Sequence, residues 1–246
     1  MTASSDPEPT DSAGTPWRRR ELSPSGFETD TGRADPALRA LLADPCDDAG
    51  LVAAVAAARL LVPVVAEPGE LDDSGEHTVE KSVDMAAVTL VAPDGRRALP
   101  VFTGADSLAA WDPAARPVPV TAARAAQAAV SEGCDVLVLD VAGPATRVLR
   151  PSMLWALAQE RAWVAAPTDP FVARSVAAAV AEEPDVVDHE LEEGRPAGEG
   201  VLGVVLTLRP GLDPDAVREV ATRVGERLAT DGELRARVDG LAFRIV

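Results

Sequence analysis

The sequence is poor in aromatic residues and almost devoid of lysine. It contains no Tyr, four Phe and four Trp among 246 residues, and Lys81 is its one lysine. A surface that stacks nucleic-acid bases needs exposed aromatic side chains, and a face that binds the phosphate backbone needs clustered cations. The net charge of −17 also disfavours anionic partners. We therefore expect this protein to bind neither nucleic acid nor a membrane.

Cysteine and histidine are equally scarce. Cys46 and Cys134 are too few for a disulfide framework, and neither belongs to a C-x-x-C pattern that would suggest a metal or redox site. His77 and His189 each lie beside acidic residues and so have ligand chemistry nearby, but no fixed ligand spacing accompanies them. The sequence predicts no metal site and no cofactor.

No apolar run is long enough to cross a bilayer. The most apolar window, 51–66, is short and is interrupted by Arg59 and Pro63. The first 30 residues contain no apolar segment of the kind that an export signal requires. We expect a cytoplasmic protein.

Negative charge is concentrated in two stretches. Residues 67–84 contain seven acids and one Lys, and residues 182–199 contain eight acids and one Arg. Such runs are usually solvated loops that keep a protein soluble, and this is our main interpretation. The alternative is that they are acidic arms that contact a basic partner.

The order of the apolar patterns predicts an α+β fold, with a mixed sheet flanked by helices and a small C-terminal β-α-β unit. We divide the chain into a disordered tail at 1–35, a body at 36–168, a helix with an acidic linker at 169–200, and the β-α-β unit at 201–246. Within the body, Pro93, Asp94 and Gly95 predict a hairpin turn between two β-rich runs. Thr103 and Asp106 have the spacing of a capping box for a short helix at 105–111.

The last third has clear helix signals. Asp169 and Pro170 predict the start of one helix, and Asp213 and Pro214 the start of another. The second helix has an apolar stripe that identifies its buried face: Val217, Val220, Val224 and Leu228.

Two segments resemble catalytic motifs. The stretch 98–111 has the outline of a phosphate-binding strand, loop and helix, but Gly104 is its single glycine and no lysine follows Lys81, so we expect only a turn. Asp140 follows the apolar strand 136–139, where open sheets place functional carboxylates. Asp140 is therefore either a functional carboxylate or a turn residue acting with Gly143. No G-x-S-x-G turn is present to expose a nucleophilic serine.

Several motifs resemble one known family. Glu80-Lys81-Ser82 precedes Asp84-Met85-Ala86, the Pro-Asp-Gly turn precedes Leu-Pro-Val-Phe-Thr, Trp111 ends the short helix, and Asp140 begins Asp-x-Ala-Gly-Pro. Together they make residues 36–168 similar to the SseB N-terminal domain, in its actinobacterial form. Residues 201–246 resemble the C-terminal portion of many members. This family implies a fold but offers no catalytic residues to transfer.

From the residues and the resemblance together, we expect a non-enzymatic binding or regulatory protein, an adaptor that uses the segment 77–104 as its surface. The alternative is a small-molecule-binding domain or enzyme with a site around Asp140 and Thr103, joined by an arginine such as Arg147. A protein partner is possible, and the oligomeric state is left open. The candidate binding residues are Lys81, Asp84, Met85, Phe102, Thr103 and Asp140.

Overall fold

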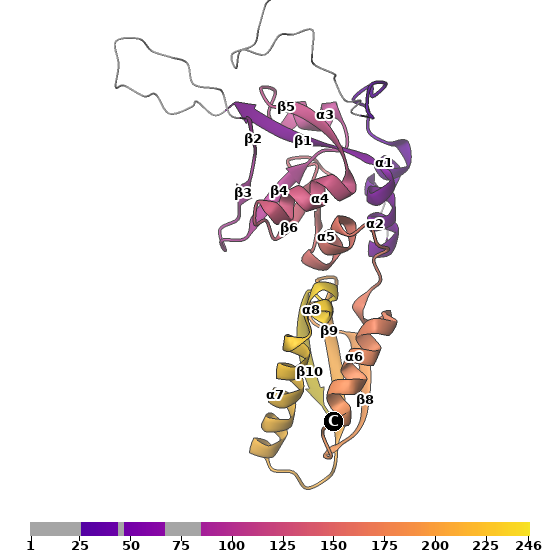
Figure 1. Ribbon diagram of the computed structural model, residues 1–246, viewed down its shortest axis with the longest axis vertical. Coiled ribbons are helices and arrows are strands. Elements are labelled where there is room, and N and C mark those ends of the chain that lie inside the picture. The colour runs from indigo at the N-terminus through magenta and orange to yellow at the C-terminus, as the bar shows by residue number, and fades with distance from the viewer. Residues whose placement is uncertain (1–25, 44–46, 67–84) are drawn as a thin grey trace, which may run out of the picture. The chain divides into compact units, whose positions relative to one another are not determined.

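The computed structural model of the protein describes residues 26–43, 47–66 and 85–246 (Figure 1). The chain forms two units, 1–31 and 32–246. In the first, the described residues 26–31 make a turn in which the Asp30 amide donates to the Phe27 carbonyl over 3.0 Å. Residues 1–25 of the predicted disordered tail lie outside the described residues, and residues 32–35 belong to the second unit. All helices and strands described below belong to the second unit.

The N-terminal part of the second unit alternates short helices and strands. The helices are α1 (Pro36–Ala43), α2 (Asp48–Ala57), α3 (Ala105–Trp111), α4 (Ala122–Ser131) and α5 (Pro151–Ala158). The strands are β1 (Arg59–Ala66), β2 (Met85–Ala87), β3 (Leu90–Val91), β4 (Arg97–Val101), β5 (Arg116–Thr121), β6 (Val136–Leu139) and β7 (Arg147–Leu149).

These strands form two sheets. The first has the order β2-β1-β5 and is antiparallel. The second has the order β3-β4-β6-β7, in which β4 and β6 are parallel and the outer pairs are antiparallel. The predicted hairpin joins β3 to β4, with Gly95 at a positive φ of 86° in its turn. An isolated bridge links the sheets, since Leu61 and Phe102 exchange two backbone hydrogen bonds of 2.8 Å.

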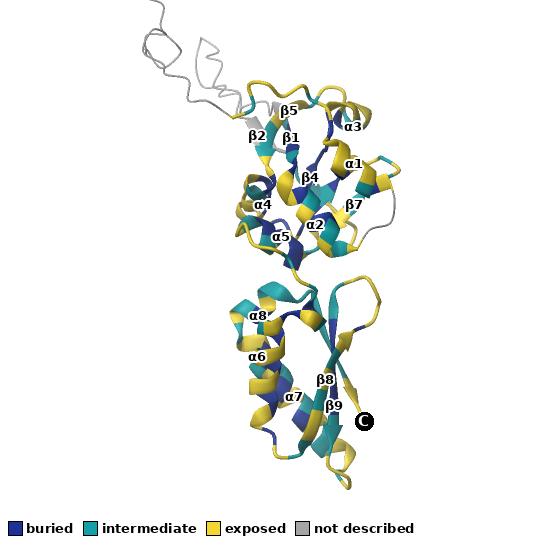
Figure 2. Cartoon of the chain, turned by 90° about the vertical axis from the view of Figure 1, so that its right-hand side faces the viewer, coloured by how far each residue is buried: buried dark blue, intermediate teal, exposed yellow. Residues whose placement is uncertain are grey.

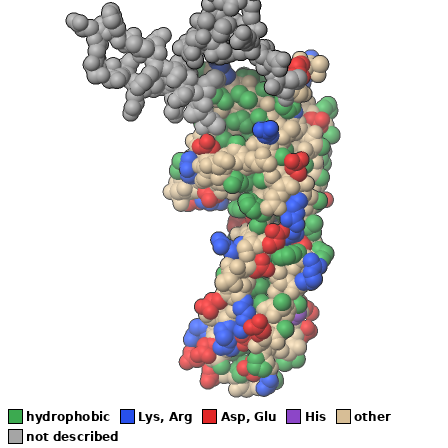
Figure 3. All heavy atoms as spheres, in the orientation of Figure 1, with side chains coloured by type: hydrophobic (Ala, Val, Ile, Leu, Met, Phe, Trp, Pro, Cys, Tyr) green, Lys and Arg blue, Asp and Glu red, His purple; other side chains and the backbone are tan. Residues whose placement is uncertain are grey.

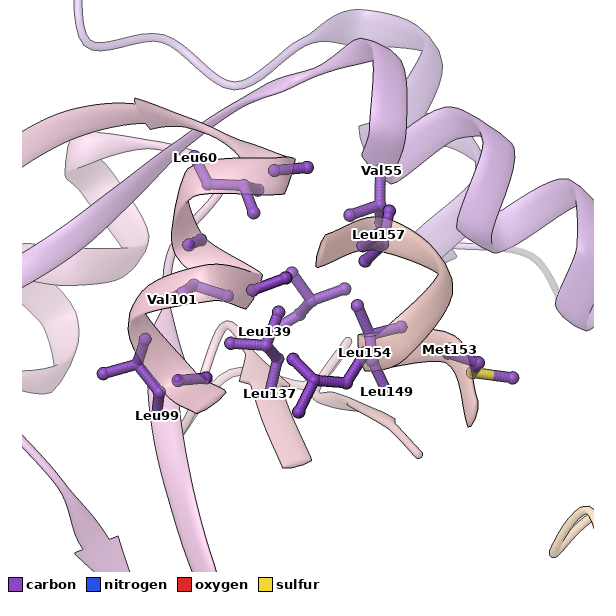
Figure 4. Packing of buried hydrophobic residues seen from close by; sticks show 14 of the residues in the cluster. Val55, Leu60, Leu99, Val101, Leu137, Leu139, Leu149, Met153, Leu154 and Leu157 are labelled. Carbon is purple, nitrogen blue, oxygen red and sulfur yellow. The ribbon is translucent and has the colours of Figure 1, made fainter. Parts of the chain in front are cut away.

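The core of this part is almost entirely aliphatic, as the scarcity of aromatic residues requires. Figure 4 shows side chains from α2, α5 and the strands meeting around Leu137 and Leu139 of β6. The strand β6 has the apolar sequence VLVL because neighbours flank it on both sides and helices pack over it. The four residues of β6 are all apolar, and the first polar side chain comes directly after its carboxyl end, at Asp140.

The C-terminal part contains α6 (Pro170–Ala181), β8 (Val186–Glu193), β9 (Val201–Leu208), α7 (Pro214–Thr230), α8 (Gly232–Arg237) and β10 (Gly240–Ile245), after a 3-10 turn at Ala166–Thr168. Its sheet has the order β10-β9-β8, and the parallel pairing of β9 with β10 confirms the predicted β-α-β unit. Figure 2 shows α6 and α7 on one side of this sheet. Asp169 and Asp213 cap α6 and α7 as expected, and the mixed α+β class is confirmed.

The second acidic stretch is not all loop, contrary to the sequence interpretation. Residues 186–193 form β8, which pairs antiparallel with β9. In this strand Asp188, Glu190 and Glu192 are exposed, whereas His189 and Leu191 are partly buried. The acids therefore occupy the solvent side of an edge strand, where charge also discourages pairing with another chain.

One acid of the same stretch is buried. The Glu183 side chain is 2% exposed and receives hydrogen bonds from Arg223 and Arg227 of α7, over 2.8 and 2.6 Å. The hydrogen bond from Arg223 outweighs the opposing effect of burial and lowers the pKa of Glu183. Figure 3 shows acidic and basic side chains interspersed in this region of α7. Glu183, just after the C-terminus of α6, therefore holds α7 next to α6, while most of the other acids of this stretch face solvent.

No helix within the described residues has both the length and the apolar character needed to cross a membrane.

Candidate functional site

The sequence singles out Asp140 and Thr103, and the structure brings them together. Thr103 lies two residues beyond β4, and Asp140 directly follows β6. Because β4 and β6 are neighbouring parallel strands, their carboxyl ends meet at the same edge of the sheet. The Thr103 amide donates to Asp140 Oδ1 over 2.9 Å, and the Thr103 hydroxyl donates to Oδ2 over 2.7 Å. Both residues are buried, at 4% and 7% exposure.

The backbone around Asp140 forms the turn that was the alternative interpretation. Asp140 has a φ of 48°, and its carbonyl accepts the Gly143 amide over 3.0 Å and the Thr146 hydroxyl over 2.8 Å. Arg147, expected beside the carboxylate, donates to the Thr146 carbonyl over 3.0 Å. Asp140 thus shapes a turn with its backbone and braces two strand ends with its side chain.

The predicted capping box at 103–106 is wrong. The N-cap of α3 is Gly104, which has no side chain to cap with, and the Thr103 hydroxyl is directed to Asp140. The helix begins at Ala105, so Thr103 lies one residue too early to be its cap. Asp106 instead forms an ion pair of 2.7 Å with Arg39. Phe102 is fully buried and packs against Trp111, with ring centroids 5.4 Å apart.

The remaining candidate residues from the sequence provide little evidence for a site. Lys81 and Asp84 lie outside the described residues, as do Cys46 and His77, and Met85 is described only as the first residue of β2. Cys134 is a buried free thiol whose pKa is raised by burial. His189 lies on β8, and in the described part of the chain no group of three acidic, histidine or cysteine side chains could hold a metal ion.

A second polar cluster, centred on Arg150, was not anticipated from the sequence. Arg150 lies between β7 and α5, and its guanidinium donates to Asp239 over 2.9 Å, to Asp48 over 2.7 Å and to the Gly198 carbonyl over 3.0 Å. Burial lowers the pKa of Arg150, but the hydrogen bonds to Asp48 and Asp239 outweigh it, so the pKa is raised overall. These partners come from α2 and from the C-terminal part, which Arg150 therefore ties together.

Asp239 and Trp163 complete this cluster through Ser152. The Ser152 amide and hydroxyl both donate to the Asp239 carboxylate, over 2.7 and 2.9 Å, and Trp163 Nε1 donates to the Ser152 hydroxyl over 3.0 Å. The Asp239 side chain is 5% exposed. Because each polar atom has a defined partner, the indole of Trp163 is held in a fixed orientation.

Gly200 is required by this cluster. It has a φ of 73°, and a Cβ there would collide with the Asp239 carboxylate and with Arg150 Nε. Gly198 has a similar φ of 80°, but a Cβ would meet nothing within 4 Å. We expect Gly200→Ala to cost about 2–3 kcal/mol, and Gly198→Ala about 1 kcal/mol from backbone strain alone. Urea denaturation of both variants measures the difference, and equal losses would contradict the collision.

Three cavities adjoin Trp163, which lines all of them. The largest, about 540 Å³, is mainly apolar, and we call it the apolar cavity; its walls include Ala49, Val52, Ala53, Ala56, Ala123 and Leu157. The second, about 350 Å³, we call the acidic cavity; it is lined by Asp47, Asp48, Glu193 and Asp239 together with Arg150 and Arg237. The third is only about 30 Å³. None of the three is lined by Asp140 or Thr103.

The family comparison covers the N-terminal part that contains most of these residues. Residues 35–156 match the family model described as the SseB protein N-terminal domain. Asp140, Thr103, Arg150 and most of the apolar cavity lie inside this match, whereas Trp163 and Asp239 lie beyond it. No curated protein and no solved structure matches the chain.

Proposed function

The chain belongs to the SseB family, and we propose that it acts in the cytoplasm as a non-enzymatic binding protein, an adaptor that holds a partner protein in the apolar cavity beside Trp163. The observation that carries this proposal is the position of Trp163, a half-buried indole that lines three adjoining cavities. Tryptophan is enriched among the residues that dominate protein interfaces, because it offers a large, rigid and amphipathic contact area.

The walls of the apolar cavity suit a protein segment. Ala49, Ala53 and Ala56 of α2 are exposed, whereas Val52 and Leu157 are buried beside them. Small side chains on the rim let a partner backbone approach closely, and the exposed alanine methyl groups together with the half-buried Trp163 ring offer apolar area to bury. Cavities of about 540 and 350 Å³ fall within the range of roughly 300–1,000 Å³ that binding sites occupy.

The state of Asp140 supports binding over catalysis. Both of its carboxylate oxygens accept hydrogen bonds from Thr103, and both residues are buried. A general base must come within hydrogen-bond reach of a substrate proton. Asp140 could do so only if its hydrogen bonds to Thr103 were broken first. The segment 77–104, proposed from the sequence as a surface, stays a prediction throughout, and its residues 77–84 lie outside the described part.

The test compares two arginine substitutions in one helix. Ala53→Arg places a long cation in the apolar cavity, and Ala57→Arg places the same side chain at an exposed α2 position that does not line it. Proteins and small molecules held by the intact chain are identified by mass spectrometry. We expect Ala53→Arg to weaken the binding of the retained protein at least about tenfold, which is roughly 1.4 kcal/mol. Ala57→Arg should leave this binding unchanged.

The opposite result would contradict the adaptor proposal. If Ala53→Arg retains every partner and a metabolite co-purifies that Asp140→Asn releases, then the adaptor proposal fails and the site is the one around Asp140 and Thr103. Both arginine variants should first show wild-type far-UV spectra and melting temperatures, because the substituted alanines are exposed.

A further inference from the structure

We propose that the segment bound in the apolar cavity also carries a basic side chain, arginine or lysine, that enters the acidic cavity beside it. This inference rests on the proposed function. Its starting point is that the two cavities share Ala49 and Trp163 as lining residues, so one short segment can reach both. The apolar cavity alone does not indicate the charge of the segment that binds there. The charge of the adjoining acidic cavity does.

The charges of the acidic cavity favour a cation. Its two guanidiniums are already engaged, because Arg150 pairs with Asp48 and Asp239, and Arg237 pairs with Asp169 and Glu233. An anionic ligand would have to displace these carboxylates from buried or half-buried ion pairs, and leaving such carboxylates unpaired is costly.

Two carboxylates lie outside these pairs. Asp47 accepts the Gly50 amide over 2.5 Å, and Glu193 accepts the Gly198 amide over 2.7 Å. Both residues are exposed, and among the ion pairs of the described residues neither is matched with an arginine. They lie on the wall of the same cavity, so a cation entering it gains their attraction without breaking an existing contact.

The apolar lining fits the stem of the same side chain. Ala165, Pro167 and Val201 line the acidic cavity along with Trp163. Lysine and arginine place a methylene stem against apolar surface and keep the charged head among polar groups. The partner segment that we infer is thus amphipathic, with an apolar residue for the larger cavity next to a basic residue for the smaller one.

The test removes the two charges without removing their hydrogen bonds. In Asp47→Asn/Glu193→Gln, the amide oxygens can still accept the Gly50 and Gly198 amides, so the helix cap and the loop are kept. The matched control, Glu132→Gln/Glu226→Gln, removes two exposed charges that line none of the three cavities. The probes are the partner captured as above and two blocked peptides of alternating leucine and arginine or leucine and glutamate, titrated by calorimetry.

We expect the arginine peptide to bind and the glutamate peptide not to bind. The Asp47→Asn/Glu193→Gln variant should bind both the partner and the arginine peptide about 5- to 20-fold more weakly at low salt, since each exposed ion pair contributes roughly two- to fivefold. Its affinity should also change less between low and high salt than that of the wild type or of the control.

The outcomes separate this inference from the proposed function. If Ala53→Arg abolishes partner binding while Asp47→Asn/Glu193→Gln has no effect, the cationic occupant is refuted and the adaptor proposal stands. Failure of the arginine peptide to bind, or equal binding of the two peptides, also overturns the inference. If neither Ala53→Arg nor Asp47→Asn/Glu193→Gln weakens the binding of the partner, both proposals fail.

Discussion

Replacing Asp239 with alanine should cost about 3–5 kcal/mol of folding free energy. The Asp239 carboxylate is 5% exposed and accepts one hydrogen bond from Arg150 and two from Ser152. Its removal leaves a guanidinium that is 16% exposed with one fewer partner, and a buried Ser152 amide with none. Uncompensated groups of this kind are what make a broken buried pair expensive.

A matched control comes from the other acid that contacts the same arginine. Asp48 also pairs with Arg150, over 2.7 Å, but its side chain is 40% exposed, so water can replace it. We expect Asp48→Ala to cost only about 1 kcal/mol. Urea denaturation followed by circular dichroism measures both variants. Equal effects would show that burial of Asp239 is not what makes the cluster strong.

Replacing Asp140 with alanine should cost about 3 kcal/mol, whereas replacing it with asparagine should cost less than about 1 kcal/mol. Alanine leaves the buried amide and hydroxyl of Thr103 without an acceptor. Asparagine can accept the Thr103 amide with its carbonyl and donate to the hydroxyl with its amide nitrogen. It also tolerates the positive φ of 48° at this position better than most residues do.

This pair of variants distinguishes a brace from a catalytic carboxylate. A brace needs the shape and the hydrogen bonds, so thermal denaturation should find Asp140→Asn close to the wild type. Thr103→Val, which keeps the amide donor and removes the hydroxyl, should cost about 1.5–3 kcal/mol, because a buried carboxylate oxygen of Asp140 loses its donor. Should Asp140→Asn prove as unstable as Asp140→Ala, the negative charge itself would be needed and the brace interpretation would be wrong.

Much of the fold is readable from the sequence because its signals are local. The Pro93-Asp94-Gly95 turn, the caps Asp169 and Asp213, and the apolar strand 136–139 each specify a short segment directly. The approach of Thr103 to Asp140 could also be anticipated, since both follow strands of the body and parallel neighbours end at the same edge.

Other features depend on distant residues and could not be predicted in the same way. The Thr103 hydroxyl has two possible uses, capping α3 or binding Asp140, and only the fold decides between them. Arg150 and Asp239 are 89 positions apart, and nothing in either local sequence marks them as partners. For Trp163 a weak signal existed, because it is one of only four tryptophans in a sequence poor in aromatic residues.

The sequence of β8 has the alternating pattern of a strand, but its high content of acidic residues suggested a loop. Its acids at 188, 190 and 192 recur at every second position, the period of a strand with one solvated face. The density of acids suggested a loop, although the alternation with His189 and Leu191 indicated an edge strand. Periodicity is the better guide here, because charge alone does not prevent β pairing.

The most direct test of the central claim is hydrogen–deuterium exchange on the intact protein with and without its captured partner. The account predicts that binding slows exchange in two segments that form the apolar cavity, α2 at 48–57 and the chain at 157–163. Exchange around 103 and 140–146 should stay unchanged. Protection confined to the residues near Asp140 and Thr103, with none at α2 or Trp163, would contradict the account.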